Sequence, residues 1–233
     1  MALNTFMNRL VVVLLLAGIG WICASRGAES AVTVAAPAVD NPKQAGPLQT
    51  AVLAGGCFWG VQGVFEHVRG VRKVLAGYSG GDQATAQYGT VSSGATGHAE
   101  SVQVLFDPSE LSFGEVLQVY FSVAHDPTQL NRQGPDSGTQ YRSAIFYADD
   151  TQKRIAQSYI VQLDKSRAFA APIVTRVDAL KGFYPAEGYH QDFLLRNPHN
   201  PYIVINDLPK IRNLKQLLPE YYRDPPVTTA ASR

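Results

Sequence analysis

The sequence predicts an α+β protein built as a two-layer sandwich, in which helices cover a mixed β-sheet and long loops connect them. Short apolar or alternating segments typical of strands are interleaved with segments whose apolar residues recur at helical spacing. The order of these segments, with one hairpin-like stretch, favours a single sheet with helices against it. A content of 45% apolar and 17% charged residues is typical of a domain that buries a core.

Strands are expected where apolar and polar side chains alternate or where short apolar runs end in turn residues. Alternation is clearest before Asp107-Pro108, where Val102, Val104 and Phe106 are separated by single residues. The first apolar run ends in Gly55-Gly56, which indicates a turn. The expected strands are residues 50–54, 71–78, 98–106, 144–147 and 173–177.

Helices are expected where apolar residues recur every three or four positions. Ser112 and Glu115 form the pattern of a capping box at the start of one such segment. Val61, Val64 and Phe65 have helical spacing in another. The expected helices are residues 58–69, 112–124, 150–165, 191–195 and 208–217.

The chain of 233 residues divides into four parts by composition. Residues 1–26 contain an apolar run that fits a signal peptide or a membrane anchor, and its length favours the signal. Residues 27–47 form an Ala/Pro-rich linker, flexible or extended, and residues 224–233 a flexible tail. Residues 48–223 are then one folded domain. We expect the protein to be exported. It would then be either periplasmic or anchored in a membrane and facing the cell envelope.

Composition and motif searches exclude several classes of protein. The net charge of +1 lacks the basic character of a nucleic-acid binder. The two cysteines exclude a disulfide scaffold and a cysteine-rich zinc site. Five histidines show no metal-ligand spacing, and no nucleotide-binding or zinc-protease motif is present. We therefore expect neither a metal nor a bound cofactor.

The most unusual segment is Gly55-Gly56-Cys57-Phe58-Trp59-Gly60, where a strand ends and a helix begins. Backbone N–H groups at a helix N-terminus favour a negative charge, which predicts a lowered pKa for the Cys57 thiol. The neighbouring aromatic rings would then flank a reactive sulfur. The alternative is a small buried cysteine packed among core aromatics, and the residues alone leave both open.

Three further stretches carry polar candidates. Glu100 begins an apolar strand, where it is either a desolvated proton donor or a solvated edge carboxylate. The long loop 126–141 contains Asp136 and Tyr141, an acceptor and a hydroxyl, or is a solvated turn. The run Glu187-Gly188-Tyr189-His190-Gln191 lines a pocket or packs on the surface.

Taken together, these motifs resemble the MsrA-type peptide methionine sulfoxide reductases. The resemblance rests on four separated motifs in the family's order, which cover nearly all of residues 48–222. They are Gly56-Cys57-Phe58-Trp59-Gly60, Thr96-Gly97-His98-Ala99-Glu100, the loop from Asn131-Arg132-Gln133-Gly134 with Asp136 to Gly138-Thr139-Gln140-Tyr141-Arg142-Ser143, and Tyr189-His190-Gln191. With the pattern of elements, the expected fold is the two-layer sandwich with a ferredoxin-like core.

The resemblance implies a role for each matched residue in the reduction of methionine-S-sulfoxide, free or in proteins. Cys57 is the nucleophile that attacks the sulfoxide sulfur, and Glu100 is the protonated carboxyl that protonates its oxygen. The remaining roles are hydroxyl donors, support of the polar wall, and contact with the substrate. Tyr88 and Tyr141 are the hydroxyl donors, and Asp136 supports these polar groups. The residues in contact with the substrate are Phe58, Trp59 and His190.

The reaction leaves a sulfenic acid on Cys57, which many family members resolve with further cysteines. No cysteine follows Cys57, and Cys23 lies in the apolar export segment. We therefore expect a monomer with one catalytic cysteine that is reduced by an external thiol, thioredoxin-like, glutaredoxin-like or small.

Two other functions remain open from the sequence. One is a different thiol enzyme, reducing peroxides or transferring acyl groups, with His98 or His190 as base. The other is a non-catalytic module that binds methyl-sulfur groups at Phe58 and Trp59.

Overall fold

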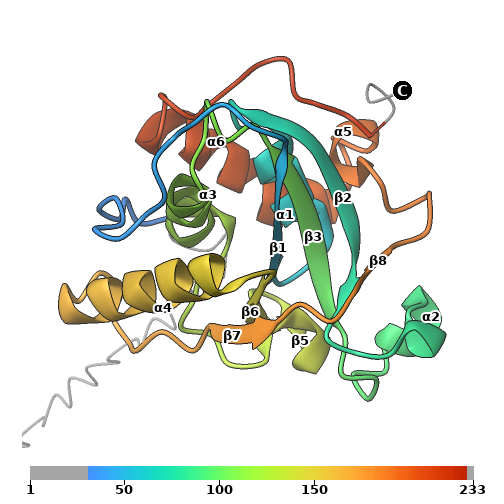
Figure 1. The fold of residues 1–233 in the computed structure, drawn as a ribbon. Helices are drawn as coiled ribbons and strands as arrows, with labels where there is room; N and C mark the ends of the chain where they lie inside the picture. The colour runs from blue at the N-terminus through green and yellow to red at the C-terminus, as the bar shows by residue number, and fades with distance from the viewer. Residues whose placement is uncertain (1–30, 230–233) are drawn as a thin grey trace, which may run out of the picture.

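The computed structural model describes residues 31–229, which form one mixed six-stranded sheet with helices packed against it (Figure 1). The strands of this sheet lie in the order β7-β6-β1-β3-β2-β8. They are β1 (Gln49–Gly55), β2 (Val71–Ser79), β3 (Ala99–Phe106), β6 (Ser143–Tyr147), β7 (Arg176–Ala179) and β8 (Phe183–Pro185). A separate two-stranded hairpin pairs β4 (Arg132–Gln133) with β5 (Asp136–Ser137).

The helices are mostly short. They are α1 (Phe58–Glu66), α2 (Tyr88–Val91), α3 (Phe113–Val119), α4 (Asp150–Lys165), α5 (Phe193–Arg196) and α6 (Leu208–Leu217). Ser112 and Glu115 form the capping box that the sequence predicts at the start of α3. The helix then continues as a π-helix over Tyr120–Ala124.

The sheet confirms the predicted α+β class. Four strands pair antiparallel as β6-β1-β3-β2, β8 adds to β2 antiparallel, and β7 pairs with β6 in parallel. The ferredoxin-like core stays a prediction, because the sheet is wider than its four central strands by one strand at each edge.

The core lies between the sheet and the helices. Alternate residues of β1, such as Ala51 and Leu53, face the main cluster together with the buried sides of α1, α3 and α4. The other residues, such as Val52 and Ala54, face a smaller cluster with Phe146 on the opposite side. This division follows from the two-residue period of a strand.

Most predicted elements are present, with shifts at some ends. α4 and α6 have the predicted bounds, whereas α1 ends three residues early and β7 begins three residues after its predicted start. No pattern in the sequence predicts β8, α2 or the β4–β5 hairpin. These elements are two to four residues long, too short for a period to be recognised.

The segment predicted as a linker is extended, but from residue 31 onward it is packed against the domain. Val34 is buried, and Ala35 O accepts a hydrogen bond from Tyr159 Oη at 2.6 Å. Asp40 accepts from the backbone N–H of Gly114 at 2.8 Å, and Lys43 pairs with Glu115 at 2.7 Å. A freely flexible linker is therefore the wrong interpretation for residues 31–47.

The tail is likewise attached over its described part. Val227 N donates to Glu66 O at 2.9 Å, and Thr229 Oγ1 donates to Asp192 at 2.7 Å. The expected signal peptide or anchor, residues 1–26, lies outside the described residues. Within residues 31–229, no helix has both the length and the apolar character needed to cross a membrane.

We predict that removing residues 31–47 destabilises the domain. A protein that begins at residue 48 should have a free energy of unfolding at least about 2 kcal/mol lower than one that begins at residue 31, because it loses the burial of Val34 and the Asp40 hydrogen bonds. Urea denaturation of both proteins measures the difference. Equal midpoints and slopes would show that the segment only rests on the surface.

Candidate active site

The antiparallel topology brings the candidate residues to one end of the sheet. β1 ends at Gly55 beside the start of β6 at Ser143, and β1 runs antiparallel to β3, which starts at Ala99. Cys57 therefore follows the end of β1 close to where Glu100 enters β3 and where Tyr141 precedes β6. Residues more than 40 positions apart meet because strand ends meet.

Cys57 occupies the N-cap of α1, after a turn that requires glycine at position 56. Gly56 has φ +89°, which a larger residue rarely adopts. A Cβ at Gly56 would also lie 2.5 Å from Cβ of Gln133 in the β4–β5 hairpin. The strand–turn–helix junction expected from the sequence is thus present, with the hairpin packed directly on it.

The predicted lowering of the Cys57 pKa is wrong for this site. Burial raises the pKa of the thiol well above its ordinary value, and the nearby carboxyl groups of Glu100, Asp207 and Asp136 raise it further. The backbone N–H of Trp59 acts in the opposite direction, as a helix N-terminus should, but its effect is smaller. The resting site therefore holds Cys57 as a thiol.

Glu100 is a desolvated carboxyl rather than a solvated edge carboxylate. Its side chain is 3% exposed, and Oε2 accepts a hydrogen bond from Phe58 N at 3.1 Å. Burial raises the pKa of Glu100 to about 8, although the Phe58 bond lowers it, and Asp136 adds to the rise. Glu100 thus carries a proton at neutral pH, next to the nucleophile candidate.

Two tyrosine hydroxyls and a carboxyl complete the polar side of the site. Burial raises the pKa of both Tyr88 and Tyr141, and both feel the charge of Glu100 and of Cys57. Asp136 in β5 accepts a short hydrogen bond from the hydroxyl of Tyr202. Burial also raises the pKa of Asp136. The structure therefore brings together the residues predicted from separate motifs.

The aromatic side of the site is built around Trp59. Its ring stacks on Phe193 with centroids 3.8 Å apart, and Nε1 donates to Nδ1 of His190 at 3.1 Å. Phe58 is buried and packs 5.0 Å from the His190 ring, which in turn lies 4.5 Å from Tyr88. His190 therefore orients the indole, with its protonated nitrogen at Nε2 because Nδ1 accepts.

Sequence reasoning missed three residues of this arrangement: Tyr202, Phe193 and Asp207. They follow the last motif in a segment without a strong pattern, and no local signal marks them. Asp207 packs where a Cβ of Gly60 would lie, 2.1 Å from its Oδ1, so the glycine of the cysteine motif makes room for this carboxyl.

The loop that carries His190 is tied to the sheet. Glu187 accepts hydrogen bonds from Tyr78 Oη and from Tyr88 N, each at 2.9 Å. Gln191 exchanges bonds with both backbone groups of Ala76 at 2.9 Å. These contacts fix the run 187–191, which the sequence left open as a pocket lining or as surface packing, against β2 and beside Tyr88.

The histidine-base alternative finds no support in the described part of the chain. His98 is buried, with its ring nitrogens bonded to Gly81 N at 3.3 Å and to Asp82 O at 3.0 Å. His190 Nδ1 is engaged by Trp59. Within residues 31–229, no group of three metal-ligating side chains gathers to hold an ion.

A buried thiol near a protonated carboxyl, two tyrosine hydroxyls and aromatic rings is the arrangement expected of a thiol-dependent enzyme. Residues 49–221 match the family model of peptide methionine sulfoxide reductase. The chain therefore belongs to this family and is an oxidoreductase that reduces methionine sulfoxide.

Individual relatives agree with this assignment. The chain is 64% identical over 187 residues to a peptide methionine sulfoxide reductase MsrA 2 of Mesorhizobium japonicum, a match that covers 80% of this chain and 96% of the relative. The corresponding Synechocystis protein is 56% identical over 72% of this chain and 78% of its own.

Two solved structures are also similar. Reduced Mxr1 of Saccharomyces cerevisiae is 32% identical, with a TM-score of 0.59 over 67% of this chain and 91% of its own. Methionine sulfoxide reductase A of Corynebacterium diphtheriae is 31% identical, with a TM-score of 0.57 over 76% and 92%.

We predict that Glu100→Gln lowers the pKa of Cys57. Glu100 is ionised at the alkaline pH where the thiol titrates, and its negative charge opposes the thiolate, so a neutral amide removes that opposition. The pH dependence of Cys57 alkylation by iodoacetamide, in the full chain with Cys23→Ser, measures the midpoint. The exposed Glu220→Gln is the control and should leave the midpoint unchanged. An upward shift in Glu100→Gln would contradict the electrostatics described above.

Proposed function

We propose that this chain reduces the S epimer of methionine sulfoxide, free or in proteins, with Cys57 as nucleophile and Glu100 as proton donor. The observation that carries the proposal is the buried Glu100 carboxyl, which accepts from the N–H of the residue next to Cys57. Its pKa of about 8 supports a proton donor at neutral pH.

The chemical step needs both groups at once. Cys57 Sγ attacks the sulfoxide sulfur while Glu100 protonates the sulfoxide oxygen, and Tyr88 and Tyr141 donate hydrogen bonds to that oxygen. The attack forms a sulfur–sulfur bond as the sulfur–oxygen bond breaks, and the oxygen leaves as water with the proton from Glu100 and the thiol proton. Water then attacks Cys57 Sγ and breaks the sulfur–sulfur bond, so that methionine leaves, Cys57 holds a sulfenic acid and the released proton returns to Glu100. The sulfoxide has its positive end at sulfur, which favours thiolate formation once substrate is bound.

The arrangement of the polar and aromatic groups supports discrimination between the two epimers. A sulfoxide sulfur is pyramidal, with an oxygen, a methyl group and the remainder of the side chain. If the oxygen lies at Glu100 and the methyl group packs on Trp59 and Phe58, the remaining bond points out of the site in only one of the two epimers. The Trp59 ring is fixed by Phe193 and His190, so it forms a rigid wall.

Turnover requires an external thiol. The sulfenic acid condenses with one thiol to a mixed disulfide and water, and a second thiol releases Cys57 and takes up the disulfide. Cys57 is the free cysteine of the described residues, and none follows it in the chain. The reductant is therefore a dithiol protein or a small thiol, and it supplies the two electrons of each cycle.

The apolar run within residues 10–24 supports an exported location. An enzyme there would repair methionine residues oxidised in envelope proteins. The reductant would then have to be one available outside the cytoplasm.

We predict that Glu100→Gln lowers the rate of sulfoxide reduction by about 10²- to 10⁴-fold, the usual contribution of a positioned acid. His190→Ala should have a smaller effect, mainly on KM, because His190 acts through Trp59. In wild type the rate should fall above pH 8 as Glu100 ionises. The assay uses the purified chain, racemic methyl p-tolyl sulfoxide and dithiothreitol, with chiral analysis of what remains.

Only the S enantiomer of this substrate should disappear, and Cys57→Ser should abolish turnover. Consumption of the R enantiomer alone, or a larger loss of rate in His190→Ala than in Glu100→Gln, would overturn the assignment. Unchanged turnover of Cys57→Ser would do so as well.

A further inference from the structure

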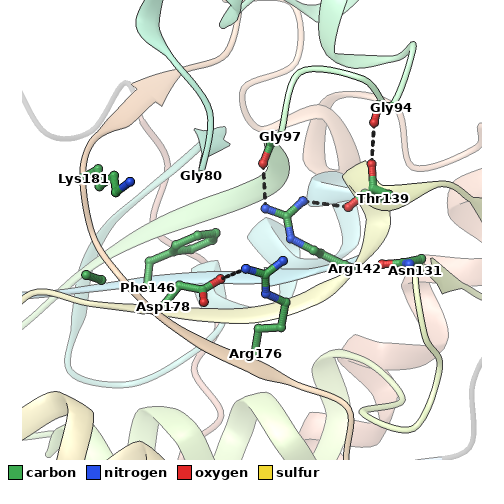
Figure 2. Close-up of a pocket in the computed structure, with 11 residues that line it drawn as sticks. Gly80, Gly94, Gly97, Asn131, Thr139, Arg142, Phe146, Arg176, Asp178 and Lys181 are labelled. Carbon is green, nitrogen blue, oxygen red and sulfur yellow. Dashed lines mark hydrogen bonds and ion pairs between the residues drawn. The ribbon is translucent and has the colours of Figure 1, made fainter.

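Arg142 is a buried cation whose hydrogen bonds go to backbone carbonyls instead of a carboxylate. Arg142 follows Tyr141 in the chain, is 6% exposed, and lines a cavity together with Gly97 and Thr139. Nη1 donates to His98 O at 3.0 Å and to Thr139 O at 2.8 Å, and Nη2 donates to Gly97 O at 2.8 Å. Figure 2 shows the guanidinium between the backbone at Gly97 and at Thr139.

These carbonyls belong to the two segments that carry the proton donors. Gly97 and His98 lead directly into β3, where Glu100 is the second residue. Thr139 begins the one-turn 3₁₀ helix that ends at Tyr141. One planar group thus connects the backbone just before Glu100 with the backbone just before Tyr141.

Two neighbouring side chains reinforce the same connection. Thr139 Oγ1 donates to Gly94 O at 2.6 Å, and Gln140 Nε2 donates to Ser92 O at 3.2 Å. Both acceptors lie between Tyr88 and Glu100 in the chain, and Figure 2 shows the bond from Thr139 to Gly94. Except for the bond from Arg142 to Thr139 O, which lies within the turn at 139–142, these bonds run from that turn to the backbone of the 92–98 loop.

The energetics favour a role beyond stability. Burying a guanidinium costs free energy unless its donors are satisfied, yet Nε of Arg142 has no hydrogen-bond partner among the described residues. Burial lowers the pKa of Arg142, and the charge of Arg176 lowers it further, whereas Asp178 opposes this effect. Asp178 itself pairs with Arg176 at 2.9 Å. If position 142 served stability alone, an apolar side chain there would avoid the free-energy cost of desolvating a guanidinium.

We infer that Arg142 is a positioning residue of the reductase, which fixes the distance between the Glu100 carboxyl and the Tyr141 hydroxyl. The inference rests on the proposed function. A guanidinium is suited to this task because its donors lie in one rigid plane, whereas the ammonium of lysine is a point charge on a flexible stem.

The test is Arg142→Lys, which keeps the charge and loses the planar donors. The rate constant kcat should fall about 10- to 100-fold, as expected for a misplaced catalytic group, with KM nearly unchanged. The alkaline limb of the pH profile should also move to lower pH, because a loosened Glu100 becomes better solvated and its pKa falls. Arg176→Lys, in the same cavity but bonded to neither segment, is the matched control and should change neither quantity.

Thr139→Val provides a second variant that removes a single bond, that to Gly94, and should shift kcat and the pH limb in the same direction by less. Circular dichroism and the thermal midpoint establish folding of each variant. If Arg142→Lys fails to fold, Thr139→Val decides the question. The inference would be overturned if Arg142→Lys, or Thr139→Val where Arg142→Lys does not fold, had the wild-type kcat and an unchanged alkaline limb of the pH profile.

A readout without sulfoxide separates this inference from the proposed function. Carbon-13 NMR of glutamate carboxyls, assigned with Glu100→Gln, reports the Glu100 pKa directly. A lower Glu100 pKa in the folded variant supports positioning even if the chain reduced no sulfoxide, and an unchanged value overturns it even if the wild type is an active reductase.

Discussion

The hydrogen bond from Phe58 N to Glu100 is the contact on which the site depends. It joins the N-terminus of α1 to the start of β3, so the position of Cys57 and that of the proton donor are set by a single bond. The N–H of Phe58 is one of the first donors of the helix, which would otherwise face the thiol or solvent. The fold directs it to the acid, and the thiol is left with the weaker influence of Trp59 N–H.

This arrangement makes the folded state less stable as pH rises. The carboxyl of Glu100 has a pKa of about 8 when folded and 4.5 as its ordinary value. Between these values the folded chain holds a proton that the unfolded chain has released, so the contribution of Glu100 to stability falls as pH increases through this window. Glu66, also buried, has its pKa raised to about 9 and acts in the same sense. Burial that suits proton donation therefore opposes stability.

The sequence predicted the fold class, the long elements and the residues of the motifs, because each of these has a local signal. Ser112 and Glu115 mark a helix start by their spacing, and the alternation around Val102 marks a strand. Asp207 and Tyr202 could not be predicted, since their place in the site follows from packing against Gly60 and Asp136, far away in the chain. The attachment of residues 31–47 was missed for the same reason: Gly114 lies 74 residues from its partner Asp40, and Tyr159 lies 124 residues from Ala35.

The error in the Cys57 pKa shows how a local rule fails inside a folded site. A helix N-terminus favours a thiolate when solvent surrounds it, but here three carboxyl groups and burial act on the same sulfur. The raised pKa of Glu100 and the raised pKa of Cys57 bear on different parts of the proposed reaction. In the reaction proposed above, a protonated Glu100 releases the oxygen, and the burial that keeps it protonated also keeps Cys57 a thiol until a polarised sulfoxide binds. Under that proposal the fold prepares the proton donor before substrate arrives, and the thiolate of Cys57 forms once the sulfoxide is bound.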